Sequence, residues 1–183
     1  MHLPVPSARY LGADDTALVT QFRCSTGPWF EARVERFIGE ELSSHHDWRA
    51  AHTDHTIIGL ETADAGLIAV TTHEEDLVRD EGAVLTSSYW EVAAVAAEFQ
   101  GAVLPEVAPL DPDGRAVTVG RYLAEVALSD MATRDREPVI RAVVARGNVR
   151  SLALCDRIGL VRRRVDADPA FIQRWGRMPV TDK

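Results

Sequence analysis

Residues 115–123 (RAVTVGRYL) place two arginines and a glycine at the expected start of a helix. The first turn of a helix offers unpaired N–H groups and the positive end of the helix dipole, so it attracts anions. Gly120 would let a phosphate approach the backbone, and Arg115 and Arg121 would add charge suited to a diphosphate. The segment predicts an anion site, although a glycine near a helix start is also typical of an ordinary turn.

A second segment, residues 148–160 (NVRSLALCDRIGL), begins with a capping residue and ends near a glycine. Asn148 is expected to cap a helix that runs to Ile158 and stops at Gly159. This helix carries Cys155, a thiol that could donate a proton from an ordinary pKa of about 8.5. The alternative is that Cys155 is only a small packing residue.

Glu91 is the candidate general base. It lies on the expected strand 89–97 with the same side-chain parity as Ala93 and Val95. Tyr89 shares that face and is a second candidate. A solvated or ion-paired glutamate is an equally simple interpretation of Glu91.

Two polar clusters lie ahead of this strand. Four histidines and two aspartates lie within eleven residues, but their spacing lacks a recognised zinc pattern: His45, His46, Asp47, His52, Asp54 and His55. A solvated loop is the simple interpretation, and recognition of a ligand is the alternative. The acidic residues 74–81 are expected in a solvated hairpin. If they line the entrance to a binding site, they would favour cationic ligands such as amines.

The elements that must position these residues are indicated by periodicity and turn signals. Helices are expected at 28–42, 115–131 and 148–158, and strands at 17–24, 56–62, 67–72, 89–97, 138–145 and 160–165. Ala-Asp-Ala-Gly at 63–66 is typical of a hairpin turn, and three prolines make 99–114 a loop. This order predicts one α/β domain over residues 1–183, with a mixed, mostly antiparallel sheet flanked by helices.

These blocks resemble the GNAT family of N-acetyltransferases. The family's coenzyme-A loop reads Arg/Gln-x-x-Gly-x-Gly/Ala, and Arg115-x-x-Thr118-x-Gly120 is similar, with Thr118 in place of the first glycine. The family's next block reads Asn-x-x-Ala/Ser-x-x-Leu-Tyr-x-x-x-Gly-Phe. It is matched, with Cys155 in place of the Tyr, at Asn148, Ser151, Leu154, Gly159 and Leu160. The resemblance spans about residues 56–165.

The resemblance implies an N-acetyltransferase in which an amine attacks acetyl-CoA, or another acyl-CoA, directly in a ternary complex. In this family the fourth and fifth strands splay apart, and the pantetheine arm bonds to the fourth strand, here at Val95, Ala96 and Ala97. Glu91 would be the base and Cys155 the acid for the leaving thiolate. The remaining cofactor contacts would fall to Arg115, Val117, Thr118, Val119, Gly120, Arg121, Asn148 and Ser151.

The sequence departs from the family after Gln100-Gly101, where the better match to the loop begins only at Arg115. Either about a dozen residues are inserted or the loop is remodelled. The alternative function is therefore a GNAT-like acyl-CoA-binding or regulatory protein with little or no turnover. A third alternative is an α/β domain that binds a different phosphate ligand.

The composition of the chain limits which binding partners are expected. The chain has 183 residues and a net charge of −8, but residues 114–183 alone contain thirteen Arg, one Lys and only eight acids. The overall negative charge disfavours a nucleic-acid partner and argues against binding to anionic membranes. Two cysteines and no signal-peptide pattern predict a reduced, cytoplasmic protein. The expected acceptor is a small-molecule or peptide amine, and a homodimer is left open.

Overall fold

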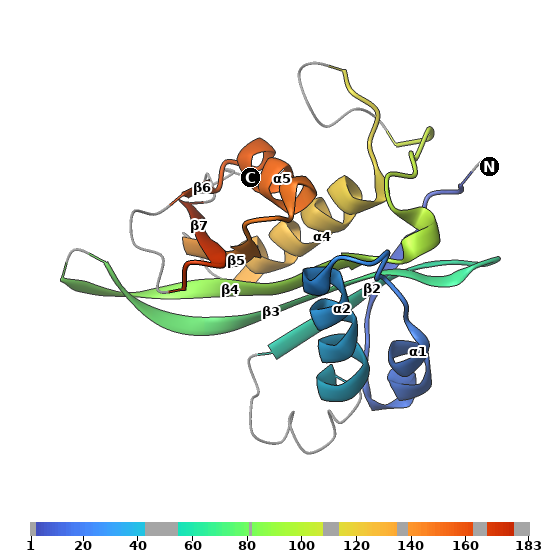
Figure 1. Ribbon diagram of the computed structural model, residues 1–183, viewed down its shortest axis with the longest axis horizontal. Helices are drawn as coiled ribbons and strands as arrows, with labels where there is room; N and C mark the ends of the chain where they lie inside the picture. Colours follow the sequence, from blue (N-terminus) through green and yellow to red (C-terminus); the bar gives the residue numbers. More distant parts are fainter. Residues whose placement is uncertain are drawn as a thin grey trace. The chain divides into compact units, whose positions relative to one another are not determined.

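The computed structural model describes residues 3–42, 55–80, 82–107, 114–134, 139–162 and 168–177. Seven strands form one mixed sheet in the order β1-β2-β3-β4-β5-β7-β6 (Figure 1). The predicted α/β class with a mixed, mostly antiparallel sheet and flanking helices is confirmed. The strands are β1 (Ser7–Tyr10), β2 (His55–Thr62), β3 (Gly66–Asp80), β4 (Ala83–Val95), β5 (Val139–Ala145), β6 (Val161–Arg162) and β7 (Phe171–Arg177). The main helices are α1 (Thr16–Gln21), α2 (Trp29–Arg36), α4 (Val119–Arg134) and α5 (Val149–Arg157).

The chain forms two compact units. The first comprises Met1–Thr72 and Val92–Ala127, and the second comprises His73–Glu91 and Leu128–Lys183. The long elements β3, β4 and α4 each contribute residues to both units. One domain over residues 1–183 therefore stays a prediction.

The first unit contains a helix where a strand was predicted. Residues 17–24 were expected to be extended, but the 3-10 turn Ala13–Asp15 leads into α1, so that prediction was wrong. The Thr20 hydroxyl donates to the Thr16 carbonyl at 2.7 Å, one helical turn back. Val19 and Phe22, three residues apart, are both buried, which is a helical and not an alternating spacing.

The helix predicted at 28–42 is present as α2 followed by a π-helical stretch, Phe37–Leu42. Pro28 precedes its first residue, and the Pro28 carbonyl accepts from the Glu31 amide at 3.0 Å. The helix is tied to the preceding loop by Glu35, whose carboxylate accepts from the Cys24 amide at 2.8 Å. The local signals in this segment were therefore sufficient to predict it.

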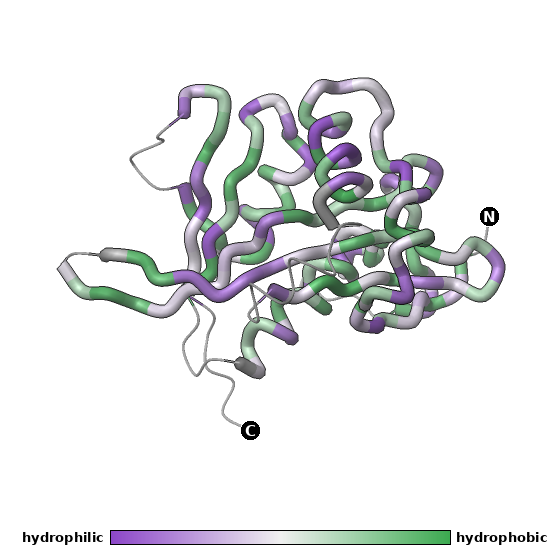
Figure 2. Tube along the Cα trace, turned by 90° about the horizontal axis from the view of Figure 1, so that it is seen from below, coloured by the Kyte–Doolittle hydropathy of each residue, from purple (hydrophilic) through white to green (hydrophobic). Residues whose placement is uncertain are grey.

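The β3–β4 hairpin is longer than the sequence pattern suggested. The acidic segment 74–81 was expected as a solvated hairpin and strand 89–97 as starting later, but β3 runs to Asp80 and β4 begins at Ala83. The turn contains Gly82 at a φ of 88°, which favours glycine. Figure 2 shows hydrophobic residues on both strands near the hairpin tip, where Leu77 and Val84 are 69% and 59% exposed.

The second unit contains the predicted strand β5 and helix α5, and two elements that were predicted incompletely. β6 is described over two residues only, and β7, which was not among the predicted strands, pairs along all of β5. Gly159 has a φ of 81° and ends α5 as predicted. His73 of β3 is buried with its Nε2 2.9 Å from the Asp130 carboxylate of α4.

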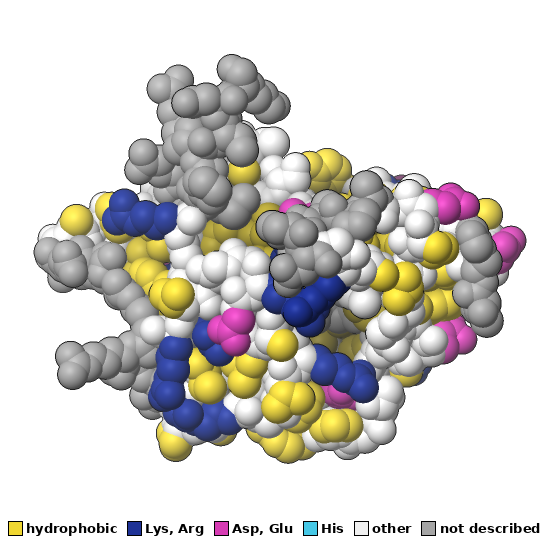
Figure 3. All heavy atoms as spheres, turned by 90° about the horizontal axis from the view of Figure 1, so that it is seen from above, with side chains coloured by type: hydrophobic (Ala, Val, Ile, Leu, Met, Phe, Trp, Pro, Cys, Tyr) yellow, Lys and Arg dark blue, Asp and Glu magenta, His cyan; other side chains and the backbone are white. Residues whose placement is uncertain are grey.

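On the face drawn in Figure 3, the Lys and Arg side chains of the described residues appear in separate groups, with hydrophobic and uncharged atoms between them. Within the described residues, no helix is both long and apolar enough to span a membrane.

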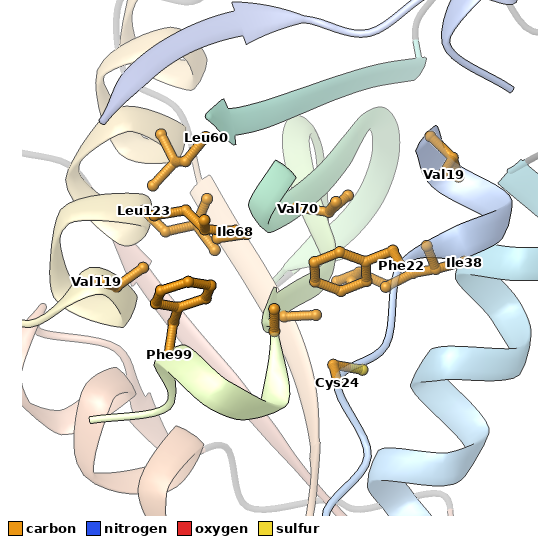
Figure 4. Packing of buried hydrophobic residues seen from close by; sticks show 14 of the residues in the cluster. Val19, Phe22, Cys24, Ile38, Leu60, Ile68, Val70, Phe99, Val119 and Leu123 are labelled. Carbon is orange, nitrogen blue, oxygen red and sulfur yellow. The ribbon is translucent and has the colours of Figure 1, made fainter. Parts of the chain in front are cut away.

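The core of the first unit packs residues of α1, of the π-helical stretch and of α4 against the sheet (Figure 4). Phe22, Ile38 and Val70 pack together in one part of it, and Ile68, Phe99 and Leu123 in another. Val119, the first residue of α4, is completely buried in the same cluster. The start of α4 is therefore anchored by apolar packing.

Gly176 of β7 allows a close approach to the turn after α5, which generates a stability prediction. A Cβ at Gly176 would lie 2.5 Å from Leu160 Cδ2 and 3.1 Å from the Gly159 carbonyl oxygen. Gly176→Ala should lower the free energy of unfolding by about 1–3 kcal/mol, measured by urea denaturation. Gly39→Ala, where a Cβ meets nothing within 4 Å and the backbone is helical, is the matched control and should leave it unchanged or raise it by up to about 1 kcal/mol. Equal effects of the two changes would contradict this packing.

Candidate functional site

The chain segments that precede and follow residues 105–116 are joined by one short antiparallel bridge just before α4. Val103 pairs with Thr118, the Leu104 amide donates to the Val117 carbonyl at 2.8 Å, and the Val119 amide donates to the Ala102 carbonyl at 3.0 Å. Twelve residues of the chain, 105–116, lie between these two bonded ends. This geometry favours the insertion alternative raised by the sequence.

The same bridge sets where α4 begins. The sequence predicted a helix from Arg115, but α4 starts at Val119, because residues 115–118 complete the bridge instead. Thr118 then caps the helix, with its Oγ1 accepting from the Arg121 amide at 3.3 Å. Of the first three amides of α4, only that of Gly120 makes no hydrogen bond within the described part of the chain.

Neither packing nor backbone strain requires a glycine at position 120. A Cβ there would meet Val95 Cγ2 at 3.6 Å, an ordinary contact, and Gly120 lies within α4 without a positive φ. Alanine would be more favourable in a helix by about 1 kcal/mol. What the glycine leaves open is an approach to its own amide, at the positive end of the helix dipole.

The two arginines of the predicted anion site lie in different environments. Arg115 is exposed, whereas the Arg121 side chain is only 11% exposed and its Nη2 lies 2.7 Å from the Glu125 carboxylate. An arginine held along its own helix in this way does not point its charge toward the first turn. Of the two, Arg115 is the one that a ligand could reach from the solvent side.

The end of β4 brings small residues to the start of α4. The Ala96 amide donates to Ile68 of β3 at 2.8 Å, and the Ala97 amide donates to the Arg23 carbonyl at 3.0 Å. Because backbone groups of successive strand residues point to opposite edges, those of Val95 face the edge of β4 away from β3. Val95 is also the residue that Gly120 faces.

The ladder between β4 and β5 is short. The parallel register joins four residue pairs, ending at Trp90 with Ala142. β4 nevertheless continues to Val95, and β5 continues to Ala145 on its other ladder, with β7. The ladder between β4 and β5 therefore ends before either strand ends.

Glu91 lies one residue beyond the end of this ladder. Burial alternates along β4: Trp90, Val92 and Ala94 are buried, while Glu91 is half-buried and Ala93 is exposed. The predicted parity of Glu91 with Ala93 is therefore correct. Tyr89, the second candidate, lies under the guanidinium of Arg141, 5.3 Å from its ring centroid.

Asn148 caps α5 as predicted. Its Oδ1 accepts from the Ser151 amide at 3.1 Å, so the two predicted cofactor-binding residues of this block contact each other. The Asn148 side-chain amide group stays available as a donor, because only the oxygen serves the cap. Both side chains are half-buried.

Cys155 is a buried thiol near a half-buried arginine, Arg174. It is 4% exposed, and burial raises its pKa to about 11, while the charge of Arg174 acts in the opposite direction. Arg174 of β7 donates to the carboxylate of the neighbouring Asp156 at 2.7 Å. At neutral pH the Cys155 side chain is therefore protonated, which is the state that a proton donor needs and that a nucleophile lacks.

Three of the four clustered histidines lie outside the described residues, and only His55, buried in β2, is placed. Within the described ranges, no group of three or more His, Cys, Asp or Glu side chains has the geometry of a metal site.

One charged group was missed by the sequence reasoning. Arg141 of β5 contacts Tyr89 of β4, Trp175 of β7 and Asp76 of β3. Only one signal was available, an arginine within the otherwise apolar strand PVIRAVVA. Its partners lie on three strands whose register the sequence does not reveal.

The Asn148 cap generates a prediction for stability. Asn148→Ala should lower the free energy of unfolding by about 1 kcal/mol because the Ser151 amide loses its acceptor. Asn148→Asp keeps an acceptor at a helix start and should stay close to wild type. Urea denaturation of the three proteins tests this, and a stable alanine variant would show that the cap is unimportant.

The buried thiol generates a pH prediction. A thiol whose pKa is higher in the folded state than near 9 in the unfolded chain stabilises the fold below pH 9. That contribution is lost as the pH rises from about 9 toward about 11. Unfolding free energies measured from pH 8 to 11 should therefore fall less steeply for Cys155→Ala than for wild type. Identical slopes would contradict the burial of this thiol.

Comparisons with known proteins support the architecture. No protein-family model and no curated protein sequence matches the chain. Among solved structures, the PaiA N-acetyltransferase of Thermoplasma acidophilum in complex with coenzyme A is 13% identical, with a TM-score of 0.63 over 94% of this chain and 99% of that one. A Vibrio cholerae spermidine N-acetyltransferase SpeG chimera is 18% identical, with a TM-score of 0.61 over 93% of both chains.

A mutant of the toxin AtaT, bound to part of its antitoxin AtaR and to acetyl-CoA, is 10% identical, with a TM-score of 0.60 over 94% of this chain and 92% of that one. At such low identities the likeness carries the fold and leaves the chemistry to the residues. The sheet order and these neighbours together give the chain the GNAT fold.

Proposed function

We propose that the chain is an acyl-CoA-dependent N-acetyltransferase that moves an acetyl group from acetyl-CoA to an amine. The observation that carries this proposal is the contact geometry between Gly120, at the start of α4, and Val95, at the end of β4. It combines an open helix-start amide with a strand edge directed away from β3. A phosphate group and an extended amide-containing arm are the two ligands that such groups bind.

Coenzyme A fits the residues present. Gly120 would donate its amide to the pyrophosphate, and exposed Arg115 would supply charge. The backbone of Val95 would bond to the pantetheine arm. Asn148, through its free side-chain amide group, would be a further contact from α5. Structural neighbours that were solved with coenzyme A or acetyl-CoA support the same class of ligand.

Acyl-CoA would supply a thioester carbonyl to the attacking amine. A new N–C bond forms as the C–S bond breaks, the amine proton passes to the Glu91 carboxylate, and the leaving thiolate takes a proton from Cys155. Cys155 is then reprotonated from water. The high pKa of Cys155 favours its reprotonation from water, and it makes the donation of its proton to the leaving thiolate less favourable.

A second candidate is an acyl-CoA-binding protein with little turnover. Three features of the first turn of α4 favour this second candidate, because each occupies a group that could otherwise bind a diphosphate. The Val119 amide is used by Ala102, the Arg121 amide by Thr118, and the Arg121 side chain by Glu125. A thiol in place of a phenol at position 155 adds to the same argument.

Binding of acetyl-CoA, measured by calorimetry on the purified chain, tests the ligand. Gly120→Glu should weaken binding by at least about tenfold, because a carboxylate would occupy the phosphate approach and repel it. Ala132→Glu places the same charge on an exposed position of the same helix and is the matched control. Equal affinities of the two variants would overturn the assignment of this helix start.

Turnover separates the two candidates. A coupled thiol assay with a panel of amines should detect released coenzyme A in wild type, and Glu91→Gln should reduce kcat by about 10²–10⁴ without weakening acetyl-CoA binding. Tight acetyl-CoA binding without turnover on any amine would support the binding protein. Competition by dephospho-CoA equal to that by CoA would favour a different phosphate ligand.

A further inference from the structure

The second unit carries a row of aromatic and charged side chains across three strands. The register pairs Tyr89 of β4 with Arg141 of β5, and Arg141 with Trp175 of β7. Side chains of paired residues point to the same face of a sheet. Tyr89, Arg141 and Trp175 therefore form one line on one face, here named the arginine row.

The guanidinium of Arg141 is held from several directions. Its Cζ lies 5.3 Å from the ring centroid of Tyr89 and 5.6 Å from that of Trp175, within the range of a cation–π contact. Its Nε donates to Ser87 Oγ at 3.1 Å, and its Nη2 pairs with the Asp76 carboxylate. The side chain is thus ordered by the protein itself, so a ligand would not have to order it.

One part of this guanidinium stays open. The Arg141 side chain is 21% exposed, and its Nη1 makes no hydrogen bond to any described residue. A planar guanidinium that is stacked between rings and has a donor group facing solvent is well suited to a carboxylate.

Charges on the same face continue this pattern. Arg177 pairs with Val139, two residues before Arg141 on β5, so it lies on the same face and is exposed. Asp76 pairs with Arg141, and Arg177 adds a second positive charge at this end of the row. Glu91 follows Tyr89 by two residues on β4 and therefore lies on the same face.

Solvent reaches the region between the arginines and Glu91. Val143, two residues after Arg141 on the same face of β5, is 40% exposed, and Glu91 is half-buried. The face therefore presents cationic groups and an anionic group on the same side of these strands. A zwitterion carries the complementary charges.

We propose that the acceptor is an amine that also carries a carboxylate, as a free amino acid does, with the carboxylate bound by Arg141 and Arg177 and the amine beside Glu91. This assignment names the acceptor class of the acetyltransferase proposed above and rests on it. Carboxylate binding can be measured without turnover, so the two proposals fail separately. Loss of acetyl-CoA binding would count against the enzyme, and loss of carboxylate binding against the acceptor class.

The probe is a panel of N-acetyl-amino acids, the products of the proposed reaction, each compared with its C-terminal amide. Tryptophan fluorescence and calorimetry on the full chain report binding. We expect an acid of the panel to bind at least about tenfold more tightly than its amide, because only the acid offers a charge to the arginines. Equal binding of acids and amides, or no binding of any acid, would overturn the proposal. Tighter binding of spermidine than of every acid would point to a cationic acceptor and would also overturn it.

Variants assign the preference to the row. Arg141→Gln should reduce the acid-to-amide ratio to below about twofold, whereas Arg157→Gln, an exposed arginine on α5, should leave it unchanged. Because Arg141 also joins three strands, folding of its variant is checked by thermal denaturation. Arg177→Gln, at an exposed position, gives an independent test and should reduce the ratio by about threefold. An unchanged ratio in both variants would remove the arginines from recognition.

Discussion

The candidate cofactor site depends on two backbone hydrogen bonds that join the chain before residue 105 to the chain after residue 116. They bind Leu104 to Val117 and Val119 to Ala102, so the chain returns to a fixed point after about a dozen residues. Closing a loop of this length costs little more entropy than closing a shorter one, which makes such an insertion tolerable. Because the return point is fixed, the first turn of α4 meets the end of β4, and Gly120 faces Val95.

The starts of α4 and α5 use the same physical device, with different consequences. In each, a side-chain oxygen accepts from the amide three residues on, Thr118 from Arg121 and Asn148 from Ser151. A family glycine in place of Thr118 would have left the Arg121 amide open for an anion. The threonine stabilises the helix and removes that donor. The departure from the family pattern is therefore an exchange of anion-binding capacity for capping, and Gly120 keeps the donor that is left.

Local signals account for what could be predicted from the sequence. Both ends of α5 carry such signals, Asn148 and Gly159, and its bounds were correct almost to the residue. α1 was missed because its Val and Thr content favours strands, although Val19 and Phe22 have helical spacing. β3 was predicted too short because its acids look like a solvated turn. The arginine row was missed for a different reason: it depends on register across strands that are far apart in the chain, which no local pattern encodes.

The charges of the second unit show most clearly what a local sequence pattern does not encode. In the sequence, the acidic residues 74–81 are expected in a solvated hairpin, and they would favour cationic amines if they lined the acceptor entrance. In the fold, Asp76 from that segment is paired with Arg141, and Arg177 lies on the same face. Interactions between exposed charges fade within about 10 Å at moderate salt, so a ligand responds to its nearest groups and not to the net charge of a segment. Register brings arginines from β5 and β7 beside that aspartate, so this face carries charges of both signs. The acceptor class proposed above therefore rests on pairing between strands more than on sequence content.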